Sequence, residues 1–363
     1  MFFNDIKAVD NHAHSIFKKI NYNRFLSAFS ESNDEKQIEY HTKRTIFYKR
    51  SLNKLIRIFD TDENDYYNES RKNNIEFLTN LFLNKANLEY LFIDDGYLRD
   101  DFFDISFFNK FVKVKRILRI EWLAEQLLKK KLSFEAFLDS FLSYLQNDQD
   151  EIVSYKSISA YRCGLDLLKV SFIDAKIEYE KKIRTDETKL QSKLLISFLI
   201  QKTLEIASEK NIPVQFHTGF GDNDLNLLKS NPLYLKDIIE EFKEVSVILL
   251  HGGYPYTKEA GYLASVYSNV YVDFGLASPF LSISGIKNTL LDLMELAPWS
   301  KILYSSDASK IPELYYLSSE ISRLCLHEVL NELIERKEIG TSEYEEISES
   351  ILRKNAMNLY NII

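Results

Sequence analysis

Two histidines separated by one residue stand near the start of the chain, in the segment 9–14. In an extended strand, residues i and i+2 point to the same face, about 6.5 to 7 Å apart, so His12 and His14 can bind one metal ion together. Asp10 lies on the same face and can hold a ring N–H of one of these histidines. A pair of surface histidines in a turn is the alternative interpretation of this motif.

The other histidines are informative because the chain has only six. His217 and His251 each close a predicted strand, and imidazole is a common ligand of zinc and similar divalent ions. Taken singly, each has an alternative as a buried histidine with a backbone partner. Four of six histidines at predicted strand ends favour a metal site, whereas His41 and His327 lie on helical segments and are expected to be structural or exposed.

Asp307 closes the last predicted strand and brings a carboxylate to the same group of residues. A carboxylate can bind a divalent ion, and beside an activated water molecule it can also accept a proton. Its alternative role is to cap the helix that follows. The four histidines favour the metal-site interpretation.

Eight short runs rich in β-branched and aromatic residues alternate with longer helical patterns along the chain. The predicted strands are 8–14, 90–94, 117–122, 152–161, 213–217, 247–251, 270–274 and 302–307. This order predicts an α/β fold, a (β/α)8 TIM-type barrel, whose active site lies at the C-terminal ends of the strands. A doubly wound open sheet is the alternative, but no Gly-rich phosphate-binding turn follows the first strand.

The chain has 363 residues, which exceeds a minimal barrel of about 250 residues. We place most of the surplus in a helical insertion at about 15–89, after the first strand, and some in a second long connection at 162–212. With ten glycines, six prolines and no linker-like stretch, the sequence predicts a single domain over residues 1–363.

Composition limits the partners and the compartment. The 46 Lys and Arg against 54 Asp and Glu give a net charge of −8, which disfavours nucleic acid and anionic membranes as partners. No apolar run reaches the roughly 18 residues of a membrane span, and the apolar N-terminal run ends at once, so secretion is not expected. Two cysteines are too few for a disulfide framework or a four-cysteine zinc site. We expect a cytoplasmic protein with a small-molecule substrate, and homo-oligomer formation stays open.

Taken together, these motifs resemble the metal-dependent amidohydrolase superfamily, and within it the amidohydrolase-2 branch. The resemblance covers almost the whole chain and extends in particular to the amidohydrolase domain of FluG-type and nodulin/glutamine-synthetase-like proteins. No synthetase-like domain follows here, so the resemblance implies a stand-alone version of that domain. The segments that carry it are 9–14, 156–162, 217–222, 251–256, 304–308 and 354–360.

The resemblance implies a role for each motif residue. His12, His14 and His217 are the implied metal ligands, and Asp307 is the implied ligand and proton acceptor. His251 is either a ligand of a second metal ion or a catalytic group beside a single ion. The implied cofactor is one or two divalent ions, with zinc as the first expectation and manganese or another ion as the alternative.

Lys156 lies on the fourth predicted strand, where binuclear members of the superfamily carry a carboxylated lysine that bridges two ions. A salt bridge from unmodified Lys156 to Glu121 or to the substrate is the alternative. The candidates for substrate binding are Arg162, Glu121, Asp222 and Tyr254. Arg162 can bind a substrate carboxylate through two parallel hydrogen bonds, although structural ion pairs among these charged residues are an alternative.

Three functions compete for this site. The first is metal-assisted hydrolysis of a C–N, amide-type bond in a small substrate, carboxylated if Arg162 binds it. Asp307 would then accept the proton of water and return it to the leaving amine, while His251 would stabilise charge on the carbonyl oxygen. The second is metal-dependent, non-oxidative decarboxylation of a small organic acid. The third is a catalytically idle barrel used as a binding module, which requires lost ligands, and every expected position keeps its residue.

Overall fold

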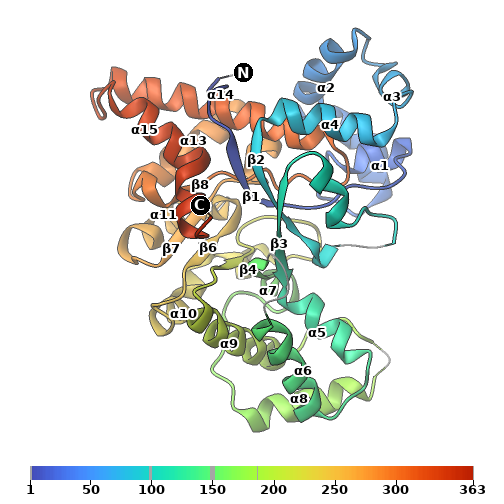
Figure 1. Ribbon diagram of the computed structural model, residues 1–363, viewed down its shortest axis with the longest axis vertical. Coiled ribbons are helices and arrows are strands. Elements are labelled where there is room, and N and C mark those ends of the chain that lie inside the picture. Colours follow the sequence, from blue (N-terminus) through green and yellow to red (C-terminus); the bar gives the residue numbers. More distant parts are fainter. Residues whose placement is uncertain (1, 98–99, 148–151, 186, 363) are drawn as a thin grey trace.

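The computed structural model describes residues 2–97, 100–147, 152–185 and 187–362. These described residues form one sheet of eight parallel strands in sequence order (Figure 1). The strands are β1 (Ala8–Ala13), β2 (Leu88–Asp94), β3 (Lys113–Arg119), β4 (Ile152–Ser157), β5 (Val214–Phe216), β6 (Val247–Leu249), β7 (Val270–Asp273) and β8 (Ile302–Leu303). Backbone hydrogen bonds join the first strand to the segment after the last, from Asn11 N to Tyr304 O over 3.1 Å and from Asp307 N to His12 O over 2.9 Å. The predicted (β/α)8 barrel is confirmed.

Helices surround this sheet, and short turns of helix connect the elements. The α-helices are α1 (Tyr22–Ser27), α2 (Ile46–Phe59), α3 (Tyr66–Ser70), α4 (Ile75–Ala86), α5 (Ile120–Leu128), α6 (Phe134–Gln146), α7 (Ser159–Arg162), α8 (Phe172–Ile183), α9 (Lys193–Lys210), α10 (Lys236–Glu241), α11 (Thr257–Val266), α12 (Ala277–Phe280), α13 (Ile283–Met294), α14 (Glu313–Glu335), α15 (Glu343–Glu349) and α16 (Asn355–Leu359). The π-helical turns are η1 (Gln37–His41) and η9 (Ser350–Lys354), and the 3-10 turns are η2 (Thr42–Arg44), η3 (Asp95–Tyr97), η4 (Ile105–Lys110), η5 (Leu227–Ser230), η6 (Pro232–Leu235), η7 (Leu250–Gly253) and η8 (Trp299–Lys301). No helix in the described part of the chain is both long and apolar enough to cross a membrane.

Local sequence sets where the helices begin and end. The Ser192 side chain accepts a hydrogen bond from Leu195 N at the start of α9, and Asn211 ends this helix with a φ of 53°. Asn87 ends α4 in the same left-handed conformation, with a φ of 56°. Serine is favoured at helix starts, and asparagine tolerates the left-handed conformation better than most residues do. These end points fix where the chain enters β2 and β5.

Alternate residues of the strands face two different cores. In β6, Val247 and Leu249 pack with the surrounding helices, whereas Ile248 belongs to the core inside the barrel. In β5, Phe216 packs outward, and Gln215 is a fully buried polar residue between outward neighbours. The period of two therefore separates an apolar outer layer from an interior that also admits polar groups.

The stretch between β1 and β2 carries α1 to α4, as expected for an insertion at about 15–89, and α4 lies beside α14 (Figure 1). Arg50 of α2 donates to Pro279 O over 2.6 Å and to Leu281 O over 2.7 Å. Lys310, which follows β8, donates to Ser27 O over 2.8 Å. The insertion is thus fastened to the loops after β7 and β8, at the C-terminal end of the barrel. The single domain over residues 1–363 stays a prediction.

Four predicted strands extended at least two residues too far. The sixth, placed at 247–251, ends at Leu249, and the eighth, placed at 302–307, ends at Leu303, so His251 and Asp307 lie in the segments that follow these strands. The third was placed at 117–122, but β3 ends at Arg119, and Glu121 therefore lies in the first turn of α5 and not at a strand end. The fourth was placed at 152–161, but β4 ends at Ser157 and α7 begins at Ser159. Buried positions at 120, 123, 124 and 127 follow helical spacing, which decides in favour of a helix after β3.

The glycine after the fifth strand provides a test of how tightly the loops at this end are packed. Gly219 has a φ of +72°, and a Cβ atom there would lie 2.3 Å from Tyr254 O. We predict that Gly219→Ala lowers the free energy of unfolding by at least about 2 kcal/mol, because it adds backbone strain and pushes the loops after β5 and β6 apart. Urea denaturation checks this against Gly340→Ala, whose added Cβ would meet the ends of two side chains, Glu343 at 3.3 Å and Ser342 at 3.6 Å. An equal loss of unfolding free energy in both variants would contradict tight packing at Gly219.

Glu31 of the insertion provides a test of pH dependence. Burial raises its pKa from 4.5 to about 7, with Lys310 opposing the rise. Between these pH values the folded chain keeps a proton that the unfolded chain has released, so this group makes stability fall as pH rises from about 4.5 to about 7. We predict that Glu31→Gln is more stabilising, relative to the unsubstituted chain, at pH 8 than at pH 5. Urea denaturation at both pH values measures the difference, with the exposed Glu335→Gln as the control; the same difference at both pH values would refute it.

Candidate metal centre and pocket

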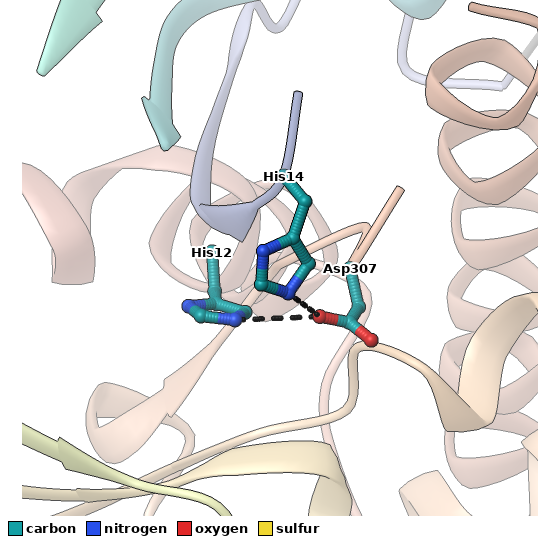
Figure 2. A group of neighbouring side chains, drawn as sticks. All are labelled: His12, His14 and Asp307. Atoms are coloured by element: carbon teal, nitrogen blue, oxygen red, sulfur yellow. Dashed lines mark ion pairs between the residues drawn. The ribbon is translucent and has the colours of Figure 1, made fainter. Parts of the chain in front are cut away.

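Three side chains from opposite ends of the chain converge at the C-terminal end of the barrel (Figure 2). His12 lies on β1, His14 directly follows it, and Asp307 follows β8. The Nε2 atoms of His12 and His14 each lie 3.3 Å from Asp307 Oδ1. One ligand atom from each residue lies within 4.8 Å of the others, so this group can hold a metal ion. The pairing of β1 with the end of β8 creates this arrangement.

Hydrogen bonds determine which ring nitrogens of these histidines carry lone pairs. Gln215 donates through Nε2 to Asn11 O over 2.9 Å, so its Oε1 is the atom that faces His12 Nδ1, at 2.8 Å. Because this oxygen only accepts, His12 Nδ1 must carry the proton and Nε2 the lone pair. In the same way, His14 Nδ1 lies 3.4 Å from Asp94 O and must donate to it, which leaves Nε2 of the neutral ring unprotonated.

With both rings neutral, the three convergent atoms all offer lone pairs, and the Lys156 ammonium lies 3.1 Å from one of them, His12 Nε2. Asp307 Oδ1 is buried and has no hydrogen bond among the described residues, although it faces two imidazole nitrogens. Nitrogen and carboxylate oxygen atoms in this number suit zinc and similar divalent ions. The residues present thus fit the metal ion that the sequence predicts.

His217 and His251 form a second pair beside this group. His217 Nε2 donates to Phe220 O over 3.0 Å, so its Nδ1 carries a lone pair, and His251 Nε2 lies 3.0 Å from that atom. The ring centroids of His251 and His12 are 6.0 Å apart. The structure therefore brings all four predicted histidines and Asp307 together, with His12, His14 and Asp307 in the tightest group.

Two of these residues adopt a strained backbone conformation. The φ angles of His251 and Asp307 are +69° and +50°, in the left-handed region that non-glycine residues rarely adopt. Asp273 holds the first turn by accepting from His251 N over 2.7 Å, and His12 O accepts from Asp307 N over 2.9 Å. Such strain costs about 1–3 kcal/mol per residue and concentrates at functional sites. Here it turns both side chains toward the barrel axis.

Burial sets the protonation states of the group. It lowers the pKa of His12 to about 4 and that of His251 to about 3. Burial by itself would raise the pKa of Asp307, but the surrounding imidazoles, with His251 first, hold it well below its usual value. At neutral pH the imidazoles of His12 and His251 are therefore neutral and the carboxylate of Asp307 is ionised, which are the forms that bind a metal ion.

Lys156, on β4, is buried directly beside this group. Its Nζ lies 3.1 Å from His12 Nε2, and burial lowers its pKa from 10.5 to about 8. The ammonium group points at the same lone pair that a metal ion would use. An ion on His12 therefore requires that Lys156 shifts or changes its chemical state.

A pocket of about 480 Å³ opens above these residues. Its walls include seven of the predicted site residues, which are His14, Lys156, Arg162, His217, Asp222, His251 and Asp307. Charged residues of both signs line it, among them Glu31 and Lys310 from the side where the insertion is fastened. The cavity is large enough for a small polar substrate.

The remaining predicted residues lie elsewhere or have other partners. Glu121 does not line this pocket; its Oε1 accepts from Ser157 Oγ over 2.7 Å and from Ile158 N over 3.0 Å. Tyr254 is 36% exposed and does not line the pocket either. Arg162 pairs with Glu125 over 3.0 Å, so the expected pairing with Glu121 is wrong. The reason is that Glu121 lies on a helix, one turn before Glu125.

Sequence analysis missed several residues of the pocket wall, among them Arg119 and Glu31, and it also missed Gln215, which lies against His12. Arg119 lies at the true end of β3 and donates to Asp94 Oδ2 from two nitrogens, over 2.6 and 3.1 Å. Because the predicted strand continued into the start of α5, Arg119 was not recognised as the residue at the strand end. Gln215 stands two residues before His217 on β5, and the i to i+2 rule could have found it. For Glu31 no signal exists in the sequence, because only the docking of the insertion places it at the pocket.

Comparison with known proteins supports the same assignment. The family model described as Amidohydrolase, of the amidohydrolase-2 branch, matches residues 185–362. Protein fluG of Emericella nidulans is 28% identical over 395 residues, an alignment that covers 98% of this chain and 45% of that protein. The chain thus spans less than half the length of this relative.

Solved structures show the same fold over the whole chain. A "putative metal-dependent hydrolase" from Lactobacillus casei ATCC 334 is 29% identical, with a TM-score of 0.90, and the alignment covers 99% of this chain and 96% of that one. A uronate isomerase from Thermotoga maritima shares the fold with a TM-score of 0.71 at 15% identity, over 98% of this chain and 95% of that one. The family match over the C-terminal half, the likeness to these proteins and the metal-binding geometry support an amidohydrolase-2 family member.

Proposed function

We propose that this chain hydrolyses a C–N, amide-type bond of a small carboxylated substrate with the help of a divalent metal ion. The observation that carries this proposal is the convergence of lone pairs from His12, His14 and Asp307 at the base of a charged pocket. The family match and the likeness to the Lactobacillus casei protein support the hydrolase class. The charged lining of the pocket, with Arg162 in it, supports a small carboxylated substrate.

His12, His14, His217 and Asp307 would hold the ion, which we propose to be zinc, with manganese as the alternative. A bound ion of this kind acts as a Lewis acid and activates water at neutral pH. His251 would be a ligand of a second ion, or a catalytic group beside a single ion. Lys156 would join the ligands only if it is carboxylated, so the proposal covers one or two ions.

The residues of the chain supply proton transfer and charge stabilisation. The ionised Asp307 is placed to accept the proton of water and to return it to the leaving amine. His251, held at the end of β6, would stabilise the developing charge on the carbonyl oxygen. Neither role requires a movement of the strands, because both groups already face the pocket.

Arg162 would bind the carboxylate of the substrate. Its Nη2 pairs with Glu125 over 3.0 Å, whereas its Nη1 is buried without a hydrogen bond among the described residues. A buried guanidinium nitrogen without a partner is costly, and a carboxylate in the pocket would satisfy it. Asp222 would contact the polar end of the substrate. Glu121 and Tyr254 have no part in this proposal, since they do not line the pocket.

Non-oxidative decarboxylation of a small organic acid is the alternative, because the same Arg162 would bind its substrate. To separate the two reactions, the metal-loaded protein is incubated with γ-glutamyl and other carboxylated amides and with small aromatic and unsaturated acids. Release of amine or ammonia supports hydrolysis, and release of carbon dioxide supports decarboxylation. A barrel used only as a binding module would release neither.

The cytoplasmic location and a homo-oligomer stay predictions.

Metal content gives the first test. We predict that the purified protein holds one or two equivalents of zinc or a similar ion, and that the double substitution of His12 and His14 by Ala removes it with little loss of fold. Elemental analysis and circular dichroism measure these quantities. His41→Ala is the matched control, since His41 is exposed. Unchanged metal content in the double variant would mean that the ligands are assigned wrongly.

Proton transfer gives the second test. We predict that Asp307→Asn lowers kcat for the amide substrate by about 10²- to 10⁴-fold, because the amide cannot accept the proton of water. The rate is compared per equivalent of bound metal, so that weaker metal binding is counted separately. Asp224→Asn, at the pocket wall and paired with Lys189, is the control. A wild-type kcat in the metal-loaded Asp307→Asn protein would exclude Asp307 as the acceptor.

A further inference from the structure

Tyr360, which follows the last helix, enters the interior of the barrel. Its side chain belongs to the same core as Val9 of β1 and Ile248 of β6. The ring packs edge-on against Phe92 of β2, with 4.8 Å between the ring centroids. The C-terminal segment therefore closes the inside of the barrel below the metal centre, and it brings a hydroxyl group to a place that is otherwise reached only by strands.

The hydroxyl group of Tyr360 touches two polar residues under His12. It accepts a hydrogen bond from Gln215 Nε2 over 2.9 Å and donates one to Asn11 Oδ1. These directions are fixed, because Asn11 Nδ2 donates to Asp273 Oδ2 over 2.9 Å, which leaves Asn11 Oδ1 as an acceptor. The proton of the hydroxyl group therefore goes to Asn11, and its lone pair is turned to Gln215.

The two N–H groups of Gln215 are both occupied by this arrangement. One is received by Tyr360 Oη and the other by Asn11 O, over 2.9 Å in each case. The amide oxygen is consequently turned to His12 Nδ1, at 2.8 Å. The whole chain of contacts is buried, so water does not replace a missing partner freely.

We propose that Tyr360 is a positioning residue for the metal centre, acting on His12 through the amide of Gln215. Together with Asn11 O, the hydroxyl group holds the amide in the orientation that keeps the proton on His12 Nδ1 and the lone pair on Nε2, toward Asp307. This inference rests on the proposed function only in taking His12 as a ligand. The tautomer of His12 in the metal-free protein can be measured without that assumption.

Loss of the hydroxyl group has a specific consequence. Gln215 then keeps Asn11 O at 2.9 Å and the more distant Asn11 Oδ1 at 3.4 Å as acceptors. Because one of its two short hydrogen bonds is lost, the amide is held less firmly and can turn over so that its nitrogen donates to His12 Nδ1. The proton of His12 must then move to Nε2, where it blocks the metal ion. Changes in residues that orient metal-binding histidines weaken metal affinity by about 10- to 100-fold.

The test compares two matched tyrosine variants. Tyr360→Phe keeps the ring and removes the hydroxyl group, and Tyr179→Phe does the same to a fully buried tyrosine of α8 whose hydroxyl group donates to Leu132 O over 2.9 Å. Long-range ¹H–¹⁵N spectra of histidine-labelled, metal-free protein report the His12 tautomer, and calorimetric titration with Zn²⁺ reports the Kd. We expect mixed His12 tautomers and an approximately 10-fold weaker Kd in Tyr360→Phe, and neither change in Tyr179→Phe. A single Nδ1–H tautomer with an unchanged Kd in Tyr360→Phe would overturn the proposal.

A second variant keeps the inference testable if Tyr360→Phe does not fold. Gln215→Met removes the amide between Tyr360 and His12 but preserves the length of the side chain, and it should reproduce both changes. Wild-type tautomer and Kd in Gln215→Met would overturn the proposal as well. His12→Ala separates this result from the proposed function: an unchanged Kd in His12→Ala contradicts the metal assignment, whereas the tautomer in metal-free protein still decides the role of Tyr360.

Discussion

The site depends on the close approach of three lone-pair atoms, from His12, His14 and Asp307, at the buried C-terminal end of the barrel. His12 Nε2 and His14 Nε2 each lie 3.3 Å from Asp307 Oδ1, and hydrogen bonds on the far side of each ring keep the lone pair of the neutral imidazole on Nε2. A cation is favourable beside these atoms, and the Lys156 ammonium already lies 3.1 Å from His12 Nε2.

The barrel holds this group because its members lie on elements that cannot move apart separately. β1 supplies two histidines, and the segment after β8 supplies Asp307, which is joined to His12 by a backbone hydrogen bond. Left-handed turns at His251 and Asp307 redirect the chain at the strand ends, and Asp273 fixes the first of them. A loop alone would relax from such conformations, but a closed sheet with packed helices does not.

Below and above the metal centre, chain segments distant in sequence complete the site. The C-terminal Tyr360 reaches the polar residues under His12, and the insertion between β1 and β2 brings Glu31 to the pocket mouth. Arg50 and Lys310 fasten that insertion to the loops after β7 and β8. Parts added to the barrel thus border the pocket and contact the residues under His12, while the strands and the segments that follow them bring the candidate metal ligands together.

The sequence by itself determined the barrel and the candidate metal-binding residues, because strand periodicity and the position of rare histidines are local properties of the chain. It also placed the helical insertion, since a long charged stretch with helical pattern needs no tertiary information. Tertiary structure alone decided that Glu121, on a helix, accepts a hydrogen bond from Ser157 of β4. It also decided that Arg162 pairs with Glu125. It also decided which nitrogen of His12 is protonated, because that depends on Gln215 and Tyr360, residues from 203 to 349 positions away from their partners on β1. Contacts of this kind are set by how the closed sheet brings distant side chains together, and no local pattern encodes them.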